Sequence, residues 1–280
     1  MLAVLGLALI ATPALAQYVV GEAQREEVRG VPDRWGFSVG SFWQAFDTRV
    51  RLNGSDGETG TDINVERDLG LPENQTNFHL AGFYRFSDHS RLDLEYVGWS
   101  RSRSTTLERQ IEWGDVVYDV GVTLSSDTSA HMVNVIYKYS FFNNGKVVFG
   151  LNGGLSSMWT DFTLSGEGTV AGGGTASGTL AESKSVIFPV PVVGVHFEMT
   201  LARKLVWEAD GNFFAATISG YHGSVNEIST SIAYFFTRNV GAGAGFSTTT
   251  YKVDTSGDRG GALDARFGFS GATAYVTFAF

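Results

Sequence analysis

Residues 271–280 read GATAYVTFAF and end the chain on Phe280. Every second residue belongs to one apolar set, which consists of Ala272, Ala274, Val276, Phe278 and Phe280. The residues between them are mostly small or polar: Gly271, Thr273, Tyr275, Thr277 and Ala279. A two-residue repeat is typical of a β-strand whose two faces meet different surroundings. The end of the chain therefore predicts a strand with one apolar face.

The same alternation organises other parts of the chain. Residues 132–141, 227–236 and 240–247 place apolar and small or polar side chains in turn. In a soluble sandwich the apolar face points into a core, whereas in an outer-membrane barrel it points outward to lipid and the polar face lines the lumen. Alternation predicts strands in both cases, so other features must decide between the two folds.

The composition favours the membrane alternative. The chain has 280 residues, with 35 Gly, 13% aromatic and 18% charged residues, and no Cys. The lack of Cys excludes a disulfide scaffold and a zinc ribbon. The net charge is -9, from 20 basic and 29 acidic residues, and no basic stripe is present, so we expect no nucleic-acid partner. Few charges with many glycines and aromatics fit a β-barrel in a bilayer.

Residues 1–16, MLAVLGLALIATPALA, predict a signal peptide. The stretch is apolar, and Ala14 and Ala16 supply the small residues of a signal-peptidase site before Gln17. It is too short to span a bilayer, and no apolar run of about 18 residues follows it. Residues 17–33 are polar and charged and predict a periplasmic tail. The expected organisation is therefore an exported chain with a barrel over 34–280.

The C-terminal strand resembles the terminal signature of bacterial outer-membrane β-barrels, with Phe278 and Phe280 as its aromatic part. This resemblance implies that the barrel-assembly machinery reads the strand that ends in Phe280. The stretch from Ile63 through Tyr96, which contains RDLGLPENQTNFHLAGFYRFSDHSRLDLEY, is similar to a family of exported, porin-like and OmpA-like Gram-negative barrels without assigned activity. That similarity implies an outer-membrane location, in contact with lipid and lipopolysaccharide, and brings no functional residues with it.

Turn signals predict a closed, all-β, antiparallel up-and-down barrel of ten strands. Short polar turns at 87–90, 142–145, 201–204 and 237–239 alternate with longer segments at 53–75, 108–116, 166–184, 219–224 and 254–262. Barrels of this class have short periplasmic turns and longer outer loops. The expected strands are 34–52, 76–87, 90–107, 117–142, 145–165, 185–201, 204–218, 225–237, 239–253 and 263–280. Eight strands is the alternative. The Gly/Ser/Thr-rich residues 166–180 predict a mobile outer loop.

Three motifs could carry chemistry, and each has a structural alternative that we favour. Glycines 241, 243 and 245 lie on one face of a predicted strand with no helix after it, so they predict space for bulky neighbours rather than a nucleotide loop. The pair His196 and Glu198 could hold a metal, but a hydrogen-bonded pair in the lumen is favoured. Trp43, Trp99, Trp113 and Trp159 predict an outer interfacial belt rather than sugar contacts.

Acidic pairs raise the possibility of an outer-membrane protease. Asp93 with Glu95, and Glu208 with Asp210, face inward by parity. Omptin proteases use an acidic pair and an Asp–His pair at the outer rim. Here Asn212, not His, stands two places after Asp210, and Asp93 directly follows a short turn near the periplasmic end. We therefore predict no catalytic, cofactor-binding or metal-binding residues, and no cofactor.

The inward charged residues predict a polar network that plugs the lumen. All of them lie in the periplasmic halves of the expected strands: Arg85, Asp93, Glu95, Lys138, His196, Glu198, Glu208 and Asp210. Charges inside a narrow barrel must be paired or wet. We therefore expect one interlocked set of ion pairs.

The predicted function is that of an integral outer-membrane barrel with a polar, plugged lumen. It would act without catalysis, in membrane integrity or in surface binding through its outer loops. The alternatives are a narrow pore or transporter for small solutes and a hydrolase at the outer rim. The sequence names no extracellular ligand.

Overall fold

A computed structural model describes residues 34–54, 59–170, 174–218, 221–255 and 262–280, without the side chains of 167–188 and 218–221. The predicted signal peptide and periplasmic tail lie outside the described residues. Within the described part of the chain, every helix is too short or too polar to cross a membrane.

Ten long strands form a closed antiparallel ring, which confirms the predicted barrel and makes the eight-strand alternative wrong. The ring contains β1 (Trp35–Leu52), β3 (Asn74–Ser87), β4 (Ser90–Thr106), β7 (Thr123–Asn143), β8 (Val147–Val170), β9 (Gly174–Ala202), β10 (Leu205–Ile218), β11 (Tyr221–Phe235), β12 (Val240–Thr255) and β13 (Leu263–Ala279). Each strand pairs with its neighbours in the chain, and β13 pairs with β1 from Gly36↔Ala279 to Leu52↔Leu263. This last pairing closes the barrel.

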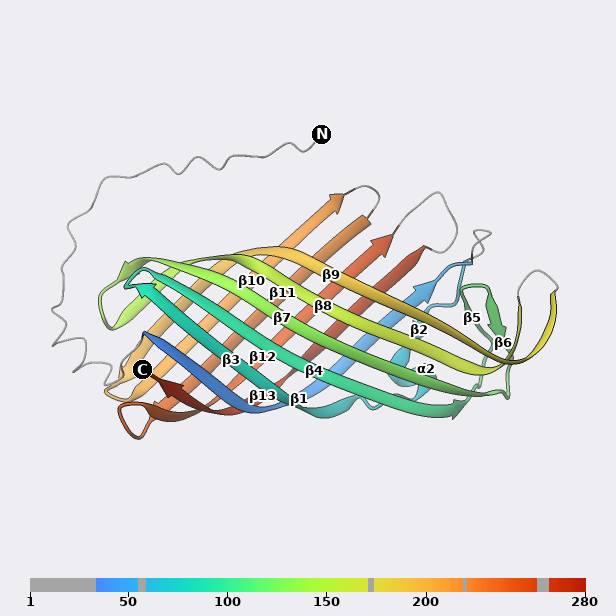
Figure 1. Cartoon of the computed structure of the whole chain (residues 1–280), viewed down its shortest axis with the longest axis horizontal. Helices are drawn as coiled ribbons and strands as arrows, with labels where there is room; N and C mark the ends of the chain where they lie inside the picture. Colours follow the sequence, from blue (N-terminus) through green and yellow to red (C-terminus); the bar gives the residue numbers. More distant parts are fainter. Residues whose placement is uncertain (1–33, 55–58, 171–173, 219–220, 256–261) are drawn as a thin grey trace.

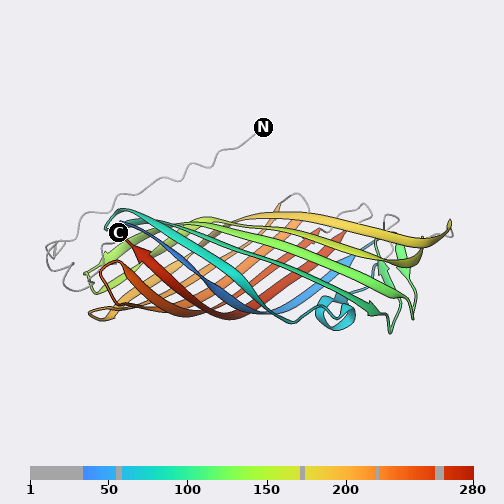
Figure 2. The same cartoon turned by 60° about the horizontal axis from the view of Figure 1, so that its bottom comes forward.

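The two ends of the barrel differ. Short turns and the C-terminus lie at one end, which we call the periplasmic end (Figure 1). The other, outer end carries the small elements β2 (Ile63–Asn64), α2 (Val65–Leu69), β5 (Ile111–Trp113) and β6 (Val116–Tyr118) (Figures 1 and 2). Strands β7, β8 and β9 are the longest, at 21, 24 and 29 residues, and extend furthest at this end.

Two predicted boundaries are wrong at the outer end. The strand expected over 117–142 starts at Thr123, because residues 116–118 pair instead with 111–113 in a separate hairpin. The loop expected over 166–180 is largely a β-ribbon, in which Gly166 lies opposite Leu180. Ladder hydrogen bonds come from the backbone, so a Gly/Ser/Thr-rich segment can continue a strand without the apolar alternation that marks one.

The faces of the strands have inverted polarity. Large apolar side chains project from the outer wall, among them Phe37, Phe78, Tyr139, Leu151, Val193 and Phe246. Polar side chains are buried inside, including Gln44, Asn134, Lys138, Asn152 and Glu198. Inward and outward positions alternate along β7 in the expected phase. An apolar outer wall around a polar interior is the arrangement of a barrel surrounded by lipid.

Aromatic side chains border the apolar band. Near the periplasmic end Trp35 stacks on Phe280 with ring centroids 4.6 Å apart. We call the outward Trp43, Phe78, Trp159, Phe213 and Phe246 the outer aromatic ring. The predicted belt holds for Trp43 and Trp159, which are exposed. It is wrong for Trp99 and Trp113, which are 6% and 1% exposed because they point into the lumen.

Glycines allow close approach where the strands close. The interpretation of residues 241–245 as packing glycines is confirmed, since they lie in β12 and a Cβ on Gly243 would lie 2.4 Å from Tyr275 Cζ. Gly271 of β13 is the tighter case, because its Cβ would lie 1.8 Å from the carbonyl oxygen of Trp43 on β1. A backbone atom cannot move aside as a ring can.

We predict that Gly271→Ala weakens the closing seam between β1 and β13. Relieving the contact requires a backbone shift, so the free energy of unfolding should fall by about 2 kcal/mol. Gly211→Ala is the control, because nothing lies within 4 Å of a Cβ at that position. Urea unfolding of both variants in lipid bilayers measures the difference, and equal stabilities would contradict this account of the seam.

Candidate functional site

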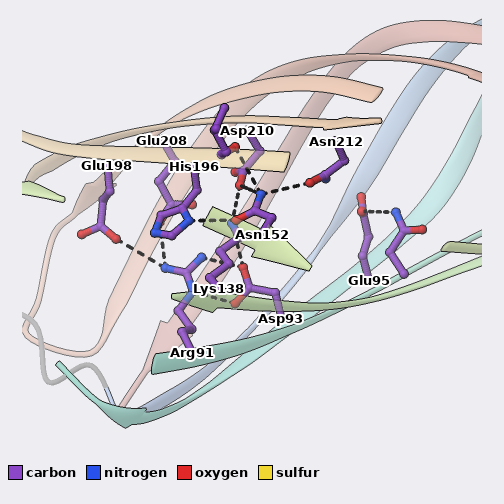
Figure 3. Close-up of polar contacts among 12 residues, drawn as sticks. Arg91, Asp93, Glu95, Lys138, Asn152, His196, Glu198, Glu208, Asp210 and Asn212 are labelled. Carbon is purple, nitrogen blue, oxygen red and sulfur yellow. Dashed lines mark hydrogen bonds and ion pairs between the residues drawn. The ribbon is translucent and has the colours of Figure 1, made fainter. Parts of the chain in front are cut away.

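Arg91 is the central cation of the periplasmic half of the lumen. It is the second residue of β4 and points inward just after the Ser87–Ser90 turn. Its guanidinium makes two bonds to Asp93, Nε to Oδ1 at 2.6 Å and Nη2 to Oδ2 at 2.8 Å. Its Nη1 also donates to Glu198 at 3.4 Å and to Glu208 at 3.3 Å (Figure 3). One side chain thus joins β4, β9 and β10.

Lys138 of β7 extends these contacts. Its Nζ lies 3.0 Å from Asp93 Oδ2 and 2.6 Å from Asp210 Oδ1. Backbone register places Lys138 directly opposite Arg91, where two cations alone would repel each other. Asp93 contacts both, which compensates the repulsion. We call Arg85, Arg91, Asp93, Lys138, Glu198, Glu208 and Asp210 the periplasmic ion network.

His196 joins this network through neutral partners. Its Nδ1 lies 2.8 Å from Asn152 Oδ1, and its Nε2 lies 3.0 Å from Ser140 Oγ. Asn152 in turn donates to Asp210 at 3.2 Å and to Asn212 at 3.0 Å. Both ring nitrogens of His196 are therefore occupied. No group of three or more His, Asp or Glu that could hold a metal ion is found in the described part of the chain.

Arg85 and Glu95 stand further from the centre. Arg85 Nη2 is 4.0 Å from Glu198, at the limit of an ion pair. Glu95 lies deeper in the barrel, where it contacts His79 Nε2 at 2.8 Å and accepts a hydrogen bond from Asn134 at 3.1 Å. Glu95 therefore belongs to a separate mid-lumen cluster. The set expected to form one interlocked network is divided into two.

In the periplasmic half and the middle of the lumen, two charged residues were not predicted from the sequence. Arg91 lies in the strand expected over 90–107 but was not named among the inward charges, although its parity with Asp93 places it inward. Glu227 of β11 faces the lumen cavity, and its neighbours Ser229 and Ser231 give no sign of a charged interior. With Glu95 and Glu227 included, carboxylates still outnumber cations inside the barrel.

A cavity of about 260 Å³ lies beside the network. Its charged lining includes Arg91, Lys138, Glu95, Asp210 and Glu227. Its apolar lining includes Ala81, Phe83, Ile136, Val206, Ala233 and Phe235. The lumen is thus polar but not completely filled at this level.

The outer half of the lumen is filled differently, and here the expectation of a polar lumen is wrong. Most of its large, fully buried side chains are apolar or aromatic and include Ile63, Val65, Leu69, Leu71, Ile111, Trp113, Tyr118 and Leu164, although Gln44 and Ser126 are buried as well. The first four come from the segment containing β2 and α2, in which β2 pairs with β1 beyond the point where β3 begins. We call residues 63–71 with the β5–β6 hairpin the outer plug. Loop residues were read as external because loops of this class usually are.

One buried ion pair anchors the outer plug to the wall. Glu66 of α2 and Arg101 of β4 lie 2.6 Å apart, with side chains only 3% and 1% exposed. Glu66 also accepts from the Thr48 amide at 2.8 Å, and Arg101 lies 4.2 Å from the centre of the Phe46 ring. Removing one partner would leave a buried charge uncompensated, which is costly.

The ends of α2 are fixed by local hydrogen bonds. Asn64 caps the helix by accepting from the Arg67 amide at 2.8 Å, and Gly70 ends it with φ of 66°. Burial raises the pKa of the Asp68 carboxyl. Hydrogen bonds from the Arg67 side chain, the Asn64 amide and Arg109 lower the pKa by more than burial raises it, so the pKa lies below its ordinary value. Asp68 therefore stays charged at neutral pH and holds Arg109 at 2.7 Å.

We predict that Lys138→Met destabilises the barrel by about 3 kcal/mol, because Asp93 and Asp210 lose a shared buried cation. Adding Asp210→Asn should recover part of this loss, since fewer uncompensated carboxylates remain. Urea unfolding of the two single variants and the double variant in bilayers gives the coupling energy. Strictly additive effects would show that the ion pair contributes nothing.

Comparison with known proteins identifies the fold alone. The sequence matches no model of a known protein family and no curated protein. Among solved structures, outer membrane protease OmpT from Escherichia coli is similar over 89% of this chain and 97% of that chain, with a TM-score of 0.55 and 13% identity. Toluene transporter TodX from Pseudomonas putida (TM-score 0.36, 11% identity, 90% and 91% covered) and OprG from Pseudomonas aeruginosa (0.34, 13%, 87% and 98%) are more distant. The chain thus has the fold of a bacterial outer-membrane β-barrel protein.

Proposed function

We propose that this protein is a non-conducting, non-enzymatic barrel that contributes to the integrity of the outer membrane. One observation supports the proposal: the barrel buries two groups of side chains of opposite chemistry, a set of ion pairs and a set of apolar residues. The periplasmic ion network lies at one level and the outer plug at the other. A barrel built to pass solutes would need neither of these groups.

The ion network resists opening because its members share partners. Asp93 contacts both Arg91 and Lys138, and Lys138 also contacts Asp210. These residues come from three strands of the barrel wall. Moving any one side chain aside would leave another charge buried and unpaired, at a cost of about 3 kcal/mol or more. The network therefore supports a static role.

The outer plug resists water for a different reason. Its core side chains Ile63, Leu69 and Trp113 are almost completely buried. Because they are apolar, they cannot replace the water molecules that hydrate an ion. The Glu66–Arg101 pair holds this segment against β4. An ion that passed the network would therefore still meet an apolar barrier.

A narrow pore is the second candidate, and the cavity of about 260 Å³ supports it. Its excess of carboxylates favours small cations over anions. The cavity lining belongs to the periplasmic half and the middle of the barrel, and none of the residues of the outer plug contributes to it. We therefore favour a closed barrel over a pore.

A rim hydrolase has less support. OmpT is named a protease, but 13% identity transfers no activity. Here Asp93, Glu208 and Asp210 take part in the periplasmic ion network, and Glu95 contacts His79 in the middle of the lumen. At the outer rim, within the described residues, His222 Nδ1 contacts Thr217 Oγ1 at 2.7 Å and no carboxylate. Incubation with peptides and with lipid A should give no turnover above that of heat-denatured protein.

We predict that the wild-type barrel gives no steady current steps in planar bilayers. Arg91→Ala with Lys138→Ala should remain silent, because the outer plug is intact. The same pair combined with a Gly/Ser replacement of residues 63–71 should conduct, since both layers are then disrupted.

The control carries the Gly/Ser replacement alone and should also be silent. Steady steps from the wild type would overturn the proposal in favour of the pore. If the combined variant runs as a folded barrel in gels but stays silent, these two layers are not what closes the lumen.

We also propose that the barrel-assembly machinery recognises β13. Phe280 projects outward, 41% exposed, at the end of the alternating apolar set. Phe280→Ser should lower the amount of protein recovered in the outer-membrane fraction several-fold, whereas Phe280→Tyr should leave it unchanged. Equal recovery of both variants would count against recognition through the terminal aromatic.

A further inference from the structure

Basic side chains are unevenly distributed over the outer wall beyond the outer aromatic ring. On the described strands, the outward cations at this level are Arg49 and Arg51 of β1, Lys252 of β12 and Arg266 of β13. The outward positions of β4, β7 and β8 hold Ser100, Ser102, Asp127, Ser129, Asp161 and Thr163 instead. Basic side chains are therefore concentrated on one face of the barrel.

Backbone register aligns three of these cations. Arg49 lies directly opposite Arg266, and Arg266 lies directly opposite Lys252. We call these three residues the cation row. Like charges at directly opposite positions of neighbouring strands destabilise a sheet. An anion bound along the row would remove this repulsion.

Three outward carboxylates, those of Asp47, Asp254 and Asp264, lie on the same strands as the cation row. Arg51, one position further out, uses Asp264 at 2.9 Å. Arg49 reaches Asp47 only at 3.9 Å, with both side chains about half exposed. Neither Lys252 nor Arg266 makes an ion pair within the described part of the chain, and both are exposed. The four outward cations of this face thus exceed its three outward carboxylates by one positive charge.

The position of the row fits a membrane headgroup. Arg49 follows Trp43 of the outer aromatic ring on the same face of β1. At a rise of about 3.3 Å per residue and a strand tilt of about 40°, Arg49 lies about 15 Å beyond that ring. Long basic side chains can bend back along the wall, which brings their charges towards the interface, where phosphate groups lie.

We propose that the cation row binds the phosphates of lipopolysaccharide in the outer leaflet. Two guanidinium groups supply paired N–H donors that match phosphate oxygens, and Lys252 adds a third positive charge. The proposal rests on the proposed role in membrane integrity and names its partner: phosphorylated glycolipid held against β1, β13 and β12.

The test uses a triple variant of the full-length barrel in detergent. Arg49→Gln, Lys252→Gln and Arg266→Gln together should weaken binding of phosphorylated lipid A, measured by native mass spectrometry, by about tenfold or more. The charge-conserving triple Arg49→Lys, Lys252→Arg and Arg266→Lys should retain binding. The matched control removes exposed cations elsewhere, through Arg103→Gln, Lys146→Gln and Arg203→Gln, and should bind as the wild type does.

Two further probes identify the ligand. Lipid A treated with phosphatase should bind the wild type as weakly as phosphorylated lipid A binds the Gln triple variant. Inorganic phosphate at the concentration of the lipid should not compete. Equal binding of lipid A with and without phosphates, equal binding by the Gln triple variant, or full competition by inorganic phosphate would each overturn the proposal.

These outcomes are separate from the test of the closed lumen. The cation row lies on the outer wall, so the Gln triple variant should remain silent in planar bilayers whether or not lipid A binds. A silent barrel that ignores lipid A would reject the cation row as a phosphate site and leave the closed lumen standing.

Discussion

The structure depends on one constraint, which is that no backbone polar group in the spanning region can be left to the lipid. The pairing of β13 with β1 satisfies it, because it removes the two edges that an open sheet would expose. Closure requires close approach at Gly271 and aligns Trp35 with Phe280 at the periplasmic end. It also creates an enclosed interior, and the contents of that interior determine what the barrel can do.

The interior is divided by chemistry along its axis. Towards the periplasm, Arg91 and Lys138 lie among carboxylates from β4, β9 and β10. Towards the outside, a segment of the first outer loop pairs with β1, and its Ile63 and Leu69 belong to the same buried apolar cluster as Trp113. The ion network is stabilised by paired charges, which would be costly to bury among apolar side chains. The outer plug is stabilised by the exclusion of water, which would be costly around unpaired charges. A polar interior alone would leave a wet path, and an apolar interior alone would leave the inward carboxylates unpaired.

The sequence predicted the strands well because a barrel wall between lipid and lumen imposes strict alternation. It also placed the charged residues that it named on the correct face, since parity is fixed once a strand is located, although Trp99 was expected on the outer wall and points inward. It could not predict which inward residues meet. Glu95 is two residues from Asp93 on the same face, yet it pairs with His79 at a deeper level. Arg91 directly follows the predicted turn at 87–90 and was not named among the inward charges. The outer plug was not predicted because its contacts join residues such as Glu66 and Arg101 that are distant in the chain.

The sequence by itself determined the strand order, the inward and outward faces and the apolar wall, because these follow from a local repeat of two residues. Only the tertiary structure decided the alignment of charges across strands. The shared position of Asp93 between Arg91 and Lys138, and the row formed by Arg49, Arg266 and Lys252, both depend on register between strands. Register is set by the closure of the whole ring, and no single strand carries it.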